Sequence, residues 1–248
     1  MTVSLAAGAL RLDLEPELGG SVGSFTLARP GGAFDLMRPL RGARQSLRAG
    51  MFPMLPFANC IRDNAFTIAG RHYRVAPNMA GARLNFHGSG WLSAWQPDEV
   101  TPTRAVLHLP DGRVDDIYRY EAIQTFSLDP AGLRVRLEVI NRGADPMPFS
   151  FGLHPWFPNH GDGRARFAAT TVVRCDPEGQ VIGREAVTAA TDYGRSRRPP
   201  TEYVNVCYAG WDGTATVDWP AAGVRLTLEA DPVFQHLMLH VPQGGEPV

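Results

Sequence analysis

Lysine is absent from this chain of 248 residues, and all 24 basic side chains are arginine. The absence excludes catalysis through a lysine Schiff base, and it excludes a P-loop, whose lysine binds nucleotide phosphates. The 25 acidic residues bring the formal net charge to −1. We therefore expect no basic surface of the kind that binds nucleic acid or an anionic membrane.

Cysteine is scarce as well. Cys60, Cys175 and Cys207 are odd in number and far apart in the sequence, which favours a reducing cytoplasm over a disulfide framework and gives no zinc-binding spacing. Long hydrophobic runs are also missing, because no segment approaches the roughly 20 apolar residues of a membrane span. Residues 1–14 lack the basic start and apolar core of a signal peptide. These features predict a cytoplasmic protein that does not enter the membrane.

Glycine and proline are plentiful, at 26 and 21 residues spread along the whole chain. They divide it into short runs, as in an all-β protein. Residues 9–15 show the clearest alternation, with Leu10, Leu12 and Leu14 on one face. No run has sustained helical periodicity, and neither a repeat nor a change in composition marks a boundary, so we predict a single domain over residues 1–248. The expected strands are 9–15, 21–28, 34–37, 65–68, 72–75, 105–109, 118–128, 133–140, 147–153, 165–175, 204–208, 214–219, 224–229 and 234–241, with turns at Asp111–Gly112 and 129–132.

A strand-like apolar run ends at His154, and Pro155 follows at once. The proline disfavours helix for His154, so the imidazole is expected at the end of a strand or in a turn. Trp156 and Phe157 offer flat apolar surfaces beside it, of the kind that often hold pyranose rings. From these residues alone, a histidine packed in the core at a strand end is an equally good interpretation.

A second histidine, His87, lies in the glycine-rich loop 85–91, where Gly88 and Gly90 would let the backbone approach a ligand closely. His87 and His154 together indicate a polar pocket in which imidazoles donate protons or hydrogen bonds to a small polyol. The chain has no Gly-x-Ser-x-Gly elbow, and no Gly-x-Gly-x-x-Gly follows a strand. Hydrolase and dinucleotide-binding functions therefore lack support.

His236 and His240 have the spacing of paired metal ligands on a helix, but they lie in the alternating run 234–241. Four residues of a strand span about 13 Å, which is too far for both side chains to bind one ion. We therefore predict no metal site.

At this point the chain resembles the aldose 1-epimerases, the galactose mutarotase-like proteins, over nearly its whole length. Residues 19–22 are similar to the early Gly-Gly turn of that family, and residues 56–63 to its Asn-Arg-Ile-Arg-Asp loop. Residues 86–88 resemble its Leu-His-Gly motif, and residues 152–157 its second histidine motif. Residues 205–212 resemble a late segment of one branch. The order and spacing of these short motifs make the resemblance specific.

The resemblance implies a large, twisted antiparallel β-sandwich without a cofactor, and an isomerase that interconverts the α and β anomers of an aldose. In such enzymes a base removes the anomeric hydroxyl proton while an acid protonates the ring oxygen, and the opened chain then closes from the other face. His154 matches the general acid, and His87 matches the histidine that assists at the ring oxygen or binds the sugar. The sugar-binding residues implied by the same motifs are Arg62, Asn59, Trp156, Asn205 and Trp211.

The chain also departs from the family pattern. Cys60 stands where the family loop has its sugar-binding arginine; Arg62 is a geometrically plausible substitute, because residues two apart on a strand point the same way. Asn205 stands where many members have an aspartate. The family's general base is a glutamate beyond one further strand, so we expect C-terminal strands and the base to lie past Val248. Glu246 follows the 234–241 strand too closely to be that base.

Two alternatives remain open. A hexose-6-phosphate 1-epimerase of the same fold would need an arginine cluster for the phosphate, for which the candidates are Arg38, Arg41, Arg44, Arg48 and Arg62. A sugar-binding or regulatory protein that has lost the chemistry would explain the departures at Cys60 and Asn205. The motifs leave the identity of the sugar and the oligomeric state open.

Overall fold

The computed structural model describes residues 1–42, 44–176 and 181–242. These residues form β-strands and short 3-10 turns without an α-helix, so the all-β prediction is confirmed. The chain divides into two compact units, Met1–Trp156 and Phe157–Val248. In this described part, no helix has the length and apolar character that crossing a membrane requires.

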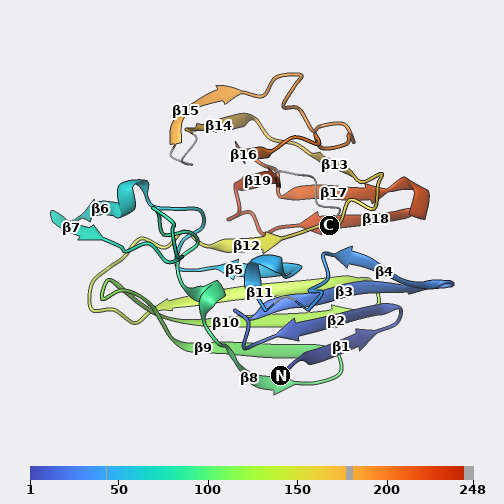
Figure 1. The fold of residues 1–248 in the computed structure, drawn as a ribbon, viewed down its shortest axis with the longest axis horizontal. Helices are drawn as coiled ribbons and strands as arrows, with labels where there is room; N and C mark the ends of the chain where they lie inside the picture. The colour runs from blue at the N-terminus through green and yellow to red at the C-terminus, as the bar shows by residue number, and fades with distance from the viewer. Residues whose placement is uncertain (43, 177–180, 243–248) are drawn as a thin grey trace. The chain divides into compact units, whose positions relative to one another are not determined.

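The first sheet of unit 1 has the strand order β1-β2-β3-β5-β12, with β4 paired to β3 (Figure 1). Strand β12 comes last in this order and pairs with β5, so two segments distant in sequence lie side by side. The bounds are β1 (Val3–Ala7), β2 (Leu10–Glu15), β3 (Ser21–Arg29), β4 (Gly32–Met37), β5 (Met51–Met54) and β12 (Gly152–Pro155).

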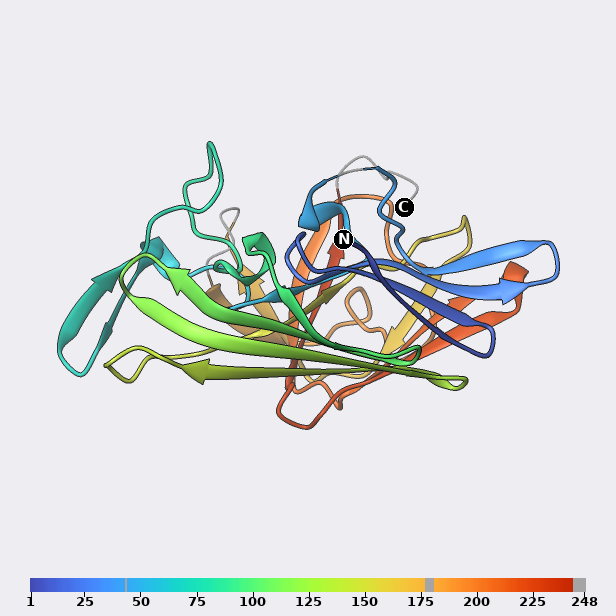
Figure 2. The same cartoon turned by 90° about the horizontal axis from the view of Figure 1, so that it is seen from below.

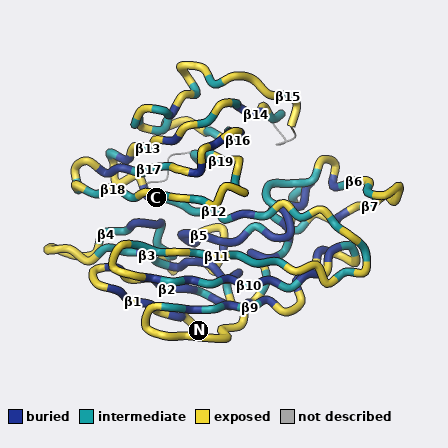
Figure 3. The backbone as a smooth tube through the Cα atoms, turned by 180° about the vertical axis from the view of Figure 1, so that it is seen from behind, coloured by how far each residue is buried: buried dark blue, intermediate teal, exposed yellow. Residues whose placement is uncertain are grey.

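The second sheet of unit 1 has the order β11-β10-β9-β8. Its long strands pack against β1 and β2, and Figure 2 shows the two sheets as layers. The core lies between them because buried residues alternate with partly or fully exposed ones along β2 and β10, as the tube in Figure 3 shows. The bounds are β8 (Gln96–Val100), β9 (Arg104–Val114), β10 (Tyr118–Asp129) and β11 (Gly132–Asn141); the predicted hairpin is confirmed as β6 (Ala65–Ile68) and β7 (Arg71–Arg74).

The expected turn at Asp111–Gly112 is wrong, because β9 continues to Val114. The register between β9 and β10 shifts at this point, so that Pro110 and Asp111 face the single residue Glu121. Such a β-bulge inserts one extra residue and accommodates a proline that a regular central strand would reject. The Asp-Gly pair therefore marks a bulge in a strand, and the chain reverses later, at residues 115–117.

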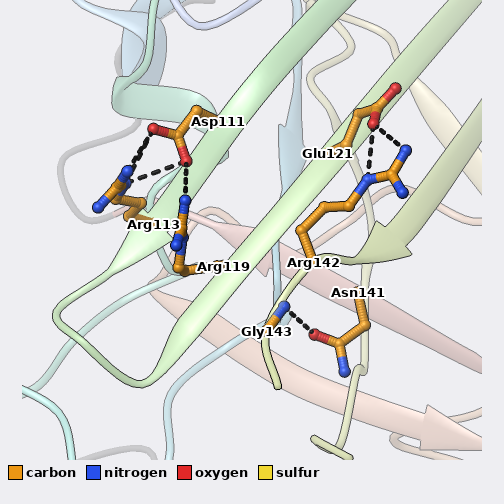
Figure 4. A network of polar contacts seen from close by, with 7 residues as sticks. All are labelled: Asp111, Arg113, Arg119, Glu121, Asn141, Arg142 and Gly143. Atoms are coloured by element: carbon orange, nitrogen blue, oxygen red, sulfur yellow. Dashed lines mark hydrogen bonds and ion pairs between the residues drawn. The ribbon is translucent and has the colours of Figure 1, made fainter. Parts of the chain in front are cut away.

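Gly112 lies directly against the ring of Tyr120, where a Cβ atom would come within 2.4 Å of the ring carbons. On the exposed side of the bulge, Asp111 forms ion pairs with Arg113 at 2.7 Å and with Arg119 at 3.8 Å (Figure 4). Exposed ion pairs contribute little to stability. The packing of Tyr120 on Gly112 therefore contributes more to the geometry of this bulge than the ion pairs do.

Unit 2 contains a sheet of order β13-β17-β18 and a sheet of order β15-β14-β16-β19. The expected strand 165–175 is wrong in extent, because the chain divides into β13 and β14, which join different sheets. The other strands expected here are confirmed within two residues at each end. The bounds are β13 (Arg164–Phe167), β14 (Thr171–Cys175), β15 (Val181–Ala186), β16 (Val204–Ala209), β17 (Thr214–Trp219), β18 (Val224–Glu229) and β19 (His236–Val241).

Candidate functional site

His154 is the third residue of β12, a strand that begins at Gly152 and not, as expected, near Met147. It is paired across the sheet with Phe52 of β5. The imidazole stacks on the Phe52 ring at a centroid distance of 4.6 Å, and on the Trp156 ring at 5.0 Å. Trp156 follows the last residue of β12, and the stacking contact places its ring beside His154. The imidazole is half-buried and restrained by two aromatic neighbours.

Trp156 is held by contacts of its backbone and its ring. Its N–H donates to the Gly50 carbonyl at 2.7 Å, and its carbonyl accepts from the Arg38 N–H at 2.9 Å. The Arg38 guanidinium carbon lies 4.2 Å from the centre of the indole ring, a cation–π contact. The same guanidinium donates through Nη2 to the carbonyls of Leu47 and Ala49. Arg38 therefore contacts both Trp156 and the backbone of the segment that leads into β5.

His87 and Gly88 both adopt left-handed backbone conformations, with φ values of +59° and +63°. A Cβ at Gly88 would lie 2.2 Å from the Leu55 carbonyl oxygen. Leu55 donates its N–H to His87 O at 3.2 Å, and its carbonyl accepts from the Ser89 N–H at 2.8 Å. We expected the glycine to allow close approach of a ligand; in the structure, Gly88 makes room for the backbone of Leu55.

Asn59 fixes the orientation of the His87 ring. Its backbone N–H donates to Nδ1 of His87 at 3.0 Å, and its carbonyl accepts from the His87 N–H at 2.7 Å. A ring nitrogen that accepts a hydrogen bond carries no proton, so the neutral His87 ring is protonated on Nε2. The structure shows the backbone of Asn59 acting on a histidine, and sugar binding by Asn59, which the sequence motif implied, stays a prediction.

The structure brings His87 and His154 together, as expected from their motifs. Their ring centroids are 5.6 Å apart and the rings are nearly perpendicular, at 79°. Phe52, which is buried, contacts both: its ring centroid lies 4.6 Å from that of His154 and 6.1 Å from that of His87. Two imidazoles with one shared apolar neighbour can exchange protons with a single small ligand.

Residues 85–91 form the loop that carries His87, which we call the histidine loop. The hydroxyl of Tyr120 forms a hydrogen bond with Ser89 Oγ of this loop at 2.8 Å. Tyr120 is fully buried, and this burial raises the pKa of its phenol to about 12. It therefore remains a neutral hydrogen-bonding group across the physiological pH range. Sequence patterns predicted the strand that carries Tyr120 but gave no sign of this contact.

Arg62 is exposed and opens the 3-10 turn η2 (Arg62–Asn64), after an extended Ile61. Cys60 forms an isolated antiparallel bridge with Phe86. The proposal that Arg62 replaces Cys60 by strand alternation is therefore wrong in its geometry, because the two residues do not belong to one continuous strand. Sugar binding by Arg62 stays a prediction on the strength of the motif alone.

Asn205 and Trp211 belong to unit 2. Trp211 is buried in a core cluster with Phe167 and Tyr208, and its Nε1 donates to the Thr214 carbonyl at 2.9 Å. These contacts give Trp211 a packing role that sequence reasoning did not include. Asn205 is exposed on β16, and its Oδ1 lies 3.2 Å from Nδ1 of His240 on β19. Sugar contacts by both residues stay predictions.

His236 and His240 lie in one strand, β19, as predicted. Within the described residues, no group of three or more histidine, cysteine or acidic side chains is arranged to hold a metal ion, and no cysteine forms a disulfide. Glu246 lies outside the described residues.

Comparison with known proteins places this arrangement in a family. The sequence model described as "Aldose 1-epimerase" matches residues 1–246. The uncharacterized protein YphB of Escherichia coli K12 is 32% identical over 242 residues, which are 94% of this chain and 78% of that protein.

Solved structures of the same family are also similar to this chain. A candidate aldose 1-epimerase from Escherichia coli K12 has a TM-score of 0.90 and 28% identity, covering 98% of this chain and 81% of that one. A galactose mutarotase-like protein from Clostridium acetobutylicum, 16% identical with the same coverage, has a TM-score of 0.79 and shares the fold. The chain therefore belongs to the aldose 1-epimerase family.

Proposed function

We propose that this chain is a cytoplasmic aldose 1-epimerase that interconverts the α and β anomers of an aldose. The observation that carries the proposal is the pair His87 and His154, whose ring centroids are 5.6 Å apart. The neutral tautomer of His87 is set by the Asn59 N–H. Two imidazoles at this distance are suited to the ring oxygen of one pyranose, where a proton has to be delivered and later withdrawn.

In the proposed mechanism, His154 is the general acid that protonates the ring oxygen as the C1–O5 bond breaks. His87 uses its Nε2–H to hold the same oxygen or a neighbouring hydroxyl. A base removes the proton from the anomeric hydroxyl, which gives the open-chain aldehyde. Rotation about C1–C2 is followed by closure from the other face, in which the C1–O5 bond re-forms. The ring oxygen then returns its proton to His154, and the base returns its proton to the aldehyde oxygen. Each step is a proton transfer, a bond rotation, or the breaking or re-forming of the C1–O5 bond without a change in oxidation state, so the proposed reaction requires no cofactor.

The aromatic stack gives His154 the rigidity that an acid at a fixed atom requires. A catalytic group has to be held close to its productive geometry, and packing against rings restrains an imidazole effectively. Phe52 and Trp156 provide these contacts. We propose that Trp156, Asn59 and Arg62 border the sugar.

A phosphorylated substrate has weaker support. Among the candidate arginines, Arg38 contacts the aromatic stack, but its guanidinium is engaged with Trp156 and two backbone carbonyls. A phosphate clamp requires arginine donors that can turn toward the ligand. The engagement of Arg38 favours a neutral aldose, and the exposed Arg62 remains a candidate for a phosphate contact. A non-catalytic sugar-binding role is the further alternative that an assay has to separate.

The test is the rate of anomer exchange after a single crystalline anomer is dissolved, followed by polarimetry or proton NMR. We expect the protein to accelerate exchange of glucose or galactose, and to act less efficiently on their 6-phosphates. Greater efficiency on the phosphates would establish the rival substrate class. Binding of a sugar, measured by calorimetry, without faster exchange would overturn the enzymatic proposal.

A further inference from the structure

We propose that Asn78 is a positioning residue for His87, and that it acts by clamping the backbone of the two residues on either side of the histidine, Phe86 and Gly88. The inference rests on the proposed function and extends it to a residue outside the family motifs. The Asn78 Nδ2 donates to the carbonyls of Phe86 at 2.7 Å and Gly88 at 2.6 Å. Its Oδ1 accepts from the Phe86 N–H at 2.9 Å. One side-chain amide thus holds the loop before and after His87.

The segment that carries Asn78 is itself anchored. The Asn85 Nδ2 donates to the Ala76 carbonyl at 2.7 Å, and the Ala76 N–H donates to a carboxylate oxygen of Asp115 at 2.7 Å. Asp115 lies in the turn between β9 and β10. These bonds tie the segment that carries Asn78 to the turn between β9 and β10.

The histidine loop has a particular need for such a clamp. His87 holds a positive φ of +59°, a conformation that disfavours a side chain with a Cβ. Its ring meets the Asn59 N–H only while the backbone keeps this conformation. Loss of the clamp would release the Nδ1 hydrogen bond, and the proton could then occupy either ring nitrogen.

Other contacts to the loop are less complete. The Trp91 Nε1 donates to the Phe86 carbonyl at 3.1 Å, but this bond holds only the side that precedes His87. The Ser89–Tyr120 contact holds the side that follows. Of the side chains of Trp91, Tyr120 and Asn78, only that of Asn78 binds the loop on both sides of His87. Its removal should therefore affect the direction of the His87 ring more than the stability of the fold.

The experiment compares Asn78→Ala and Asn78→Asp with the matched control Asn141→Ala. Asn141 is an asparagine of the same unit that also bonds to backbone: Oδ1 accepts from the Gly143 N–H at 3.0 Å (Figure 4), and Nδ2 donates to the Asp145 carbonyl at 2.9 Å. Asn78→Asp keeps an acceptor for the Phe86 N–H but loses both donors. It therefore tests the clamp if the alanine variant folds poorly.

The first readout is the nitrogen NMR spectrum of the His87 ring, assigned with a His87→Gln variant, which distinguishes a protonated from an unprotonated Nδ1. In the wild type we expect neutral His87 to show the Nε2–H tautomer. Both Asn78 variants should show a mixture, and Asn141→Ala should be unchanged. This readout needs no catalysis, so it decides the clamp even if the protein proves inactive.

The second readout is anomer exchange. Small misplacements of a catalytic group can cost about 100-fold in rate, so we expect kcat of Asn78→Ala to fall between about 10-fold and 100-fold while KM changes much less. Asn78→Asp should show a loss of the same kind. If a folded Asn78 variant retains the wild-type His87 tautomer and the kcat of the Asn141→Ala control, the assignment is overturned.

Discussion

The backbone N–H of Asn59 donates to Nδ1 of His87 at 3.0 Å, while the His87 N–H donates back to the Asn59 carbonyl at 2.7 Å. Two loops that are separate in sequence are thus joined by a reciprocal pair of hydrogen bonds. One consequence is chemical, because the proton of a neutral His87 is confined to Nε2. The other is mechanical, because neither loop can shift without disturbing the other.

Substitution of His154 should remove most of the catalysis. General acid–base groups contribute about 10²- to 10⁴-fold, so His154→Ala should slow enzyme-catalysed anomer exchange by that factor while the fold is retained. The measurement is exchange spectroscopy by NMR on a sugar at equilibrium, together with circular dichroism to check folding.

The matched control is His72→Ala. His72 is an exposed histidine of β7 in the same unit, and its replacement should leave the exchange rate unchanged. Near wild-type rates for His154→Ala would remove His154 from the role of acid.

Gly88→Ala should destabilise the protein and disturb His87. The new Cβ would meet the Leu55 carbonyl oxygen at 2.2 Å in a left-handed conformation, at φ +63°. We expect a loss of about 2–3 kcal/mol in the free energy of unfolding, measured by urea denaturation, together with a fall in anomer exchange.

Gly70→Ala provides the comparison, because Gly70 also has a positive φ, of +77°, but a Cβ added there would meet no atom within 4 Å. Gly70→Ala should lower the free energy of unfolding by about 1–2 kcal/mol, the cost of the left-handed backbone conformation alone. Anomer exchange should be unchanged. Equal effects of the two substitutions would show that the contact with Leu55 is unimportant.

Alkaline pH should weaken the fold through Tyr120. Burial raises the pKa of this phenol to about 12, from 10.0 in the unfolded chain. Its contribution is fully present below pH 10 and is lost as the pH rises toward 12, because the unfolded state releases its proton first. Between these two pH values, the free energy of unfolding falls by up to about 1.4 kcal/mol per pH unit. Urea denaturation between pH 8 and about 11.5 should show a shallower decline for Tyr120→Phe than for the wild type; parallel curves would contradict the shift.

Much of the fold was readable from the sequence where a strand has one buried and one exposed face, although β1, which alternates in the same way, was not predicted. The alternating leucines of β2 and the alternation in β10 illustrate this. Strand β8 was missed because all five of its residues are exposed, which leaves no alternation to read. Asp111–Gly112 was misread as a turn because local composition is the same for a hairpin and a bulge. The register that separates the two is set by residues of another strand, Tyr120 and Ala122.

The candidate site was predictable only in part. The two histidines stood out because proline, glycine and aromatic residues surround them in the sequence. Asn78 gave no signal, since a side-chain clamp on a distant loop depends on the path of the chain and leaves no local pattern. The assumed strand alternation between Cys60 and Arg62 was wrong because the backbone turns there, with Asp63 at a φ of +53°; sugar binding by Arg62 stays a prediction.

Phe52 is a single buried ring that both imidazoles touch. We therefore expect the two histidines to be energetically coupled, because residues in contact commonly show interaction energies of about 0.5–3 kcal/mol. A change that tilts the Phe52 ring to suit one histidine will displace the other. Adaptation of this site to a differently shaped sugar would thus require coordinated substitutions in the strand that bears Phe52 and in both histidine segments. The two histidines should therefore change together in evolution.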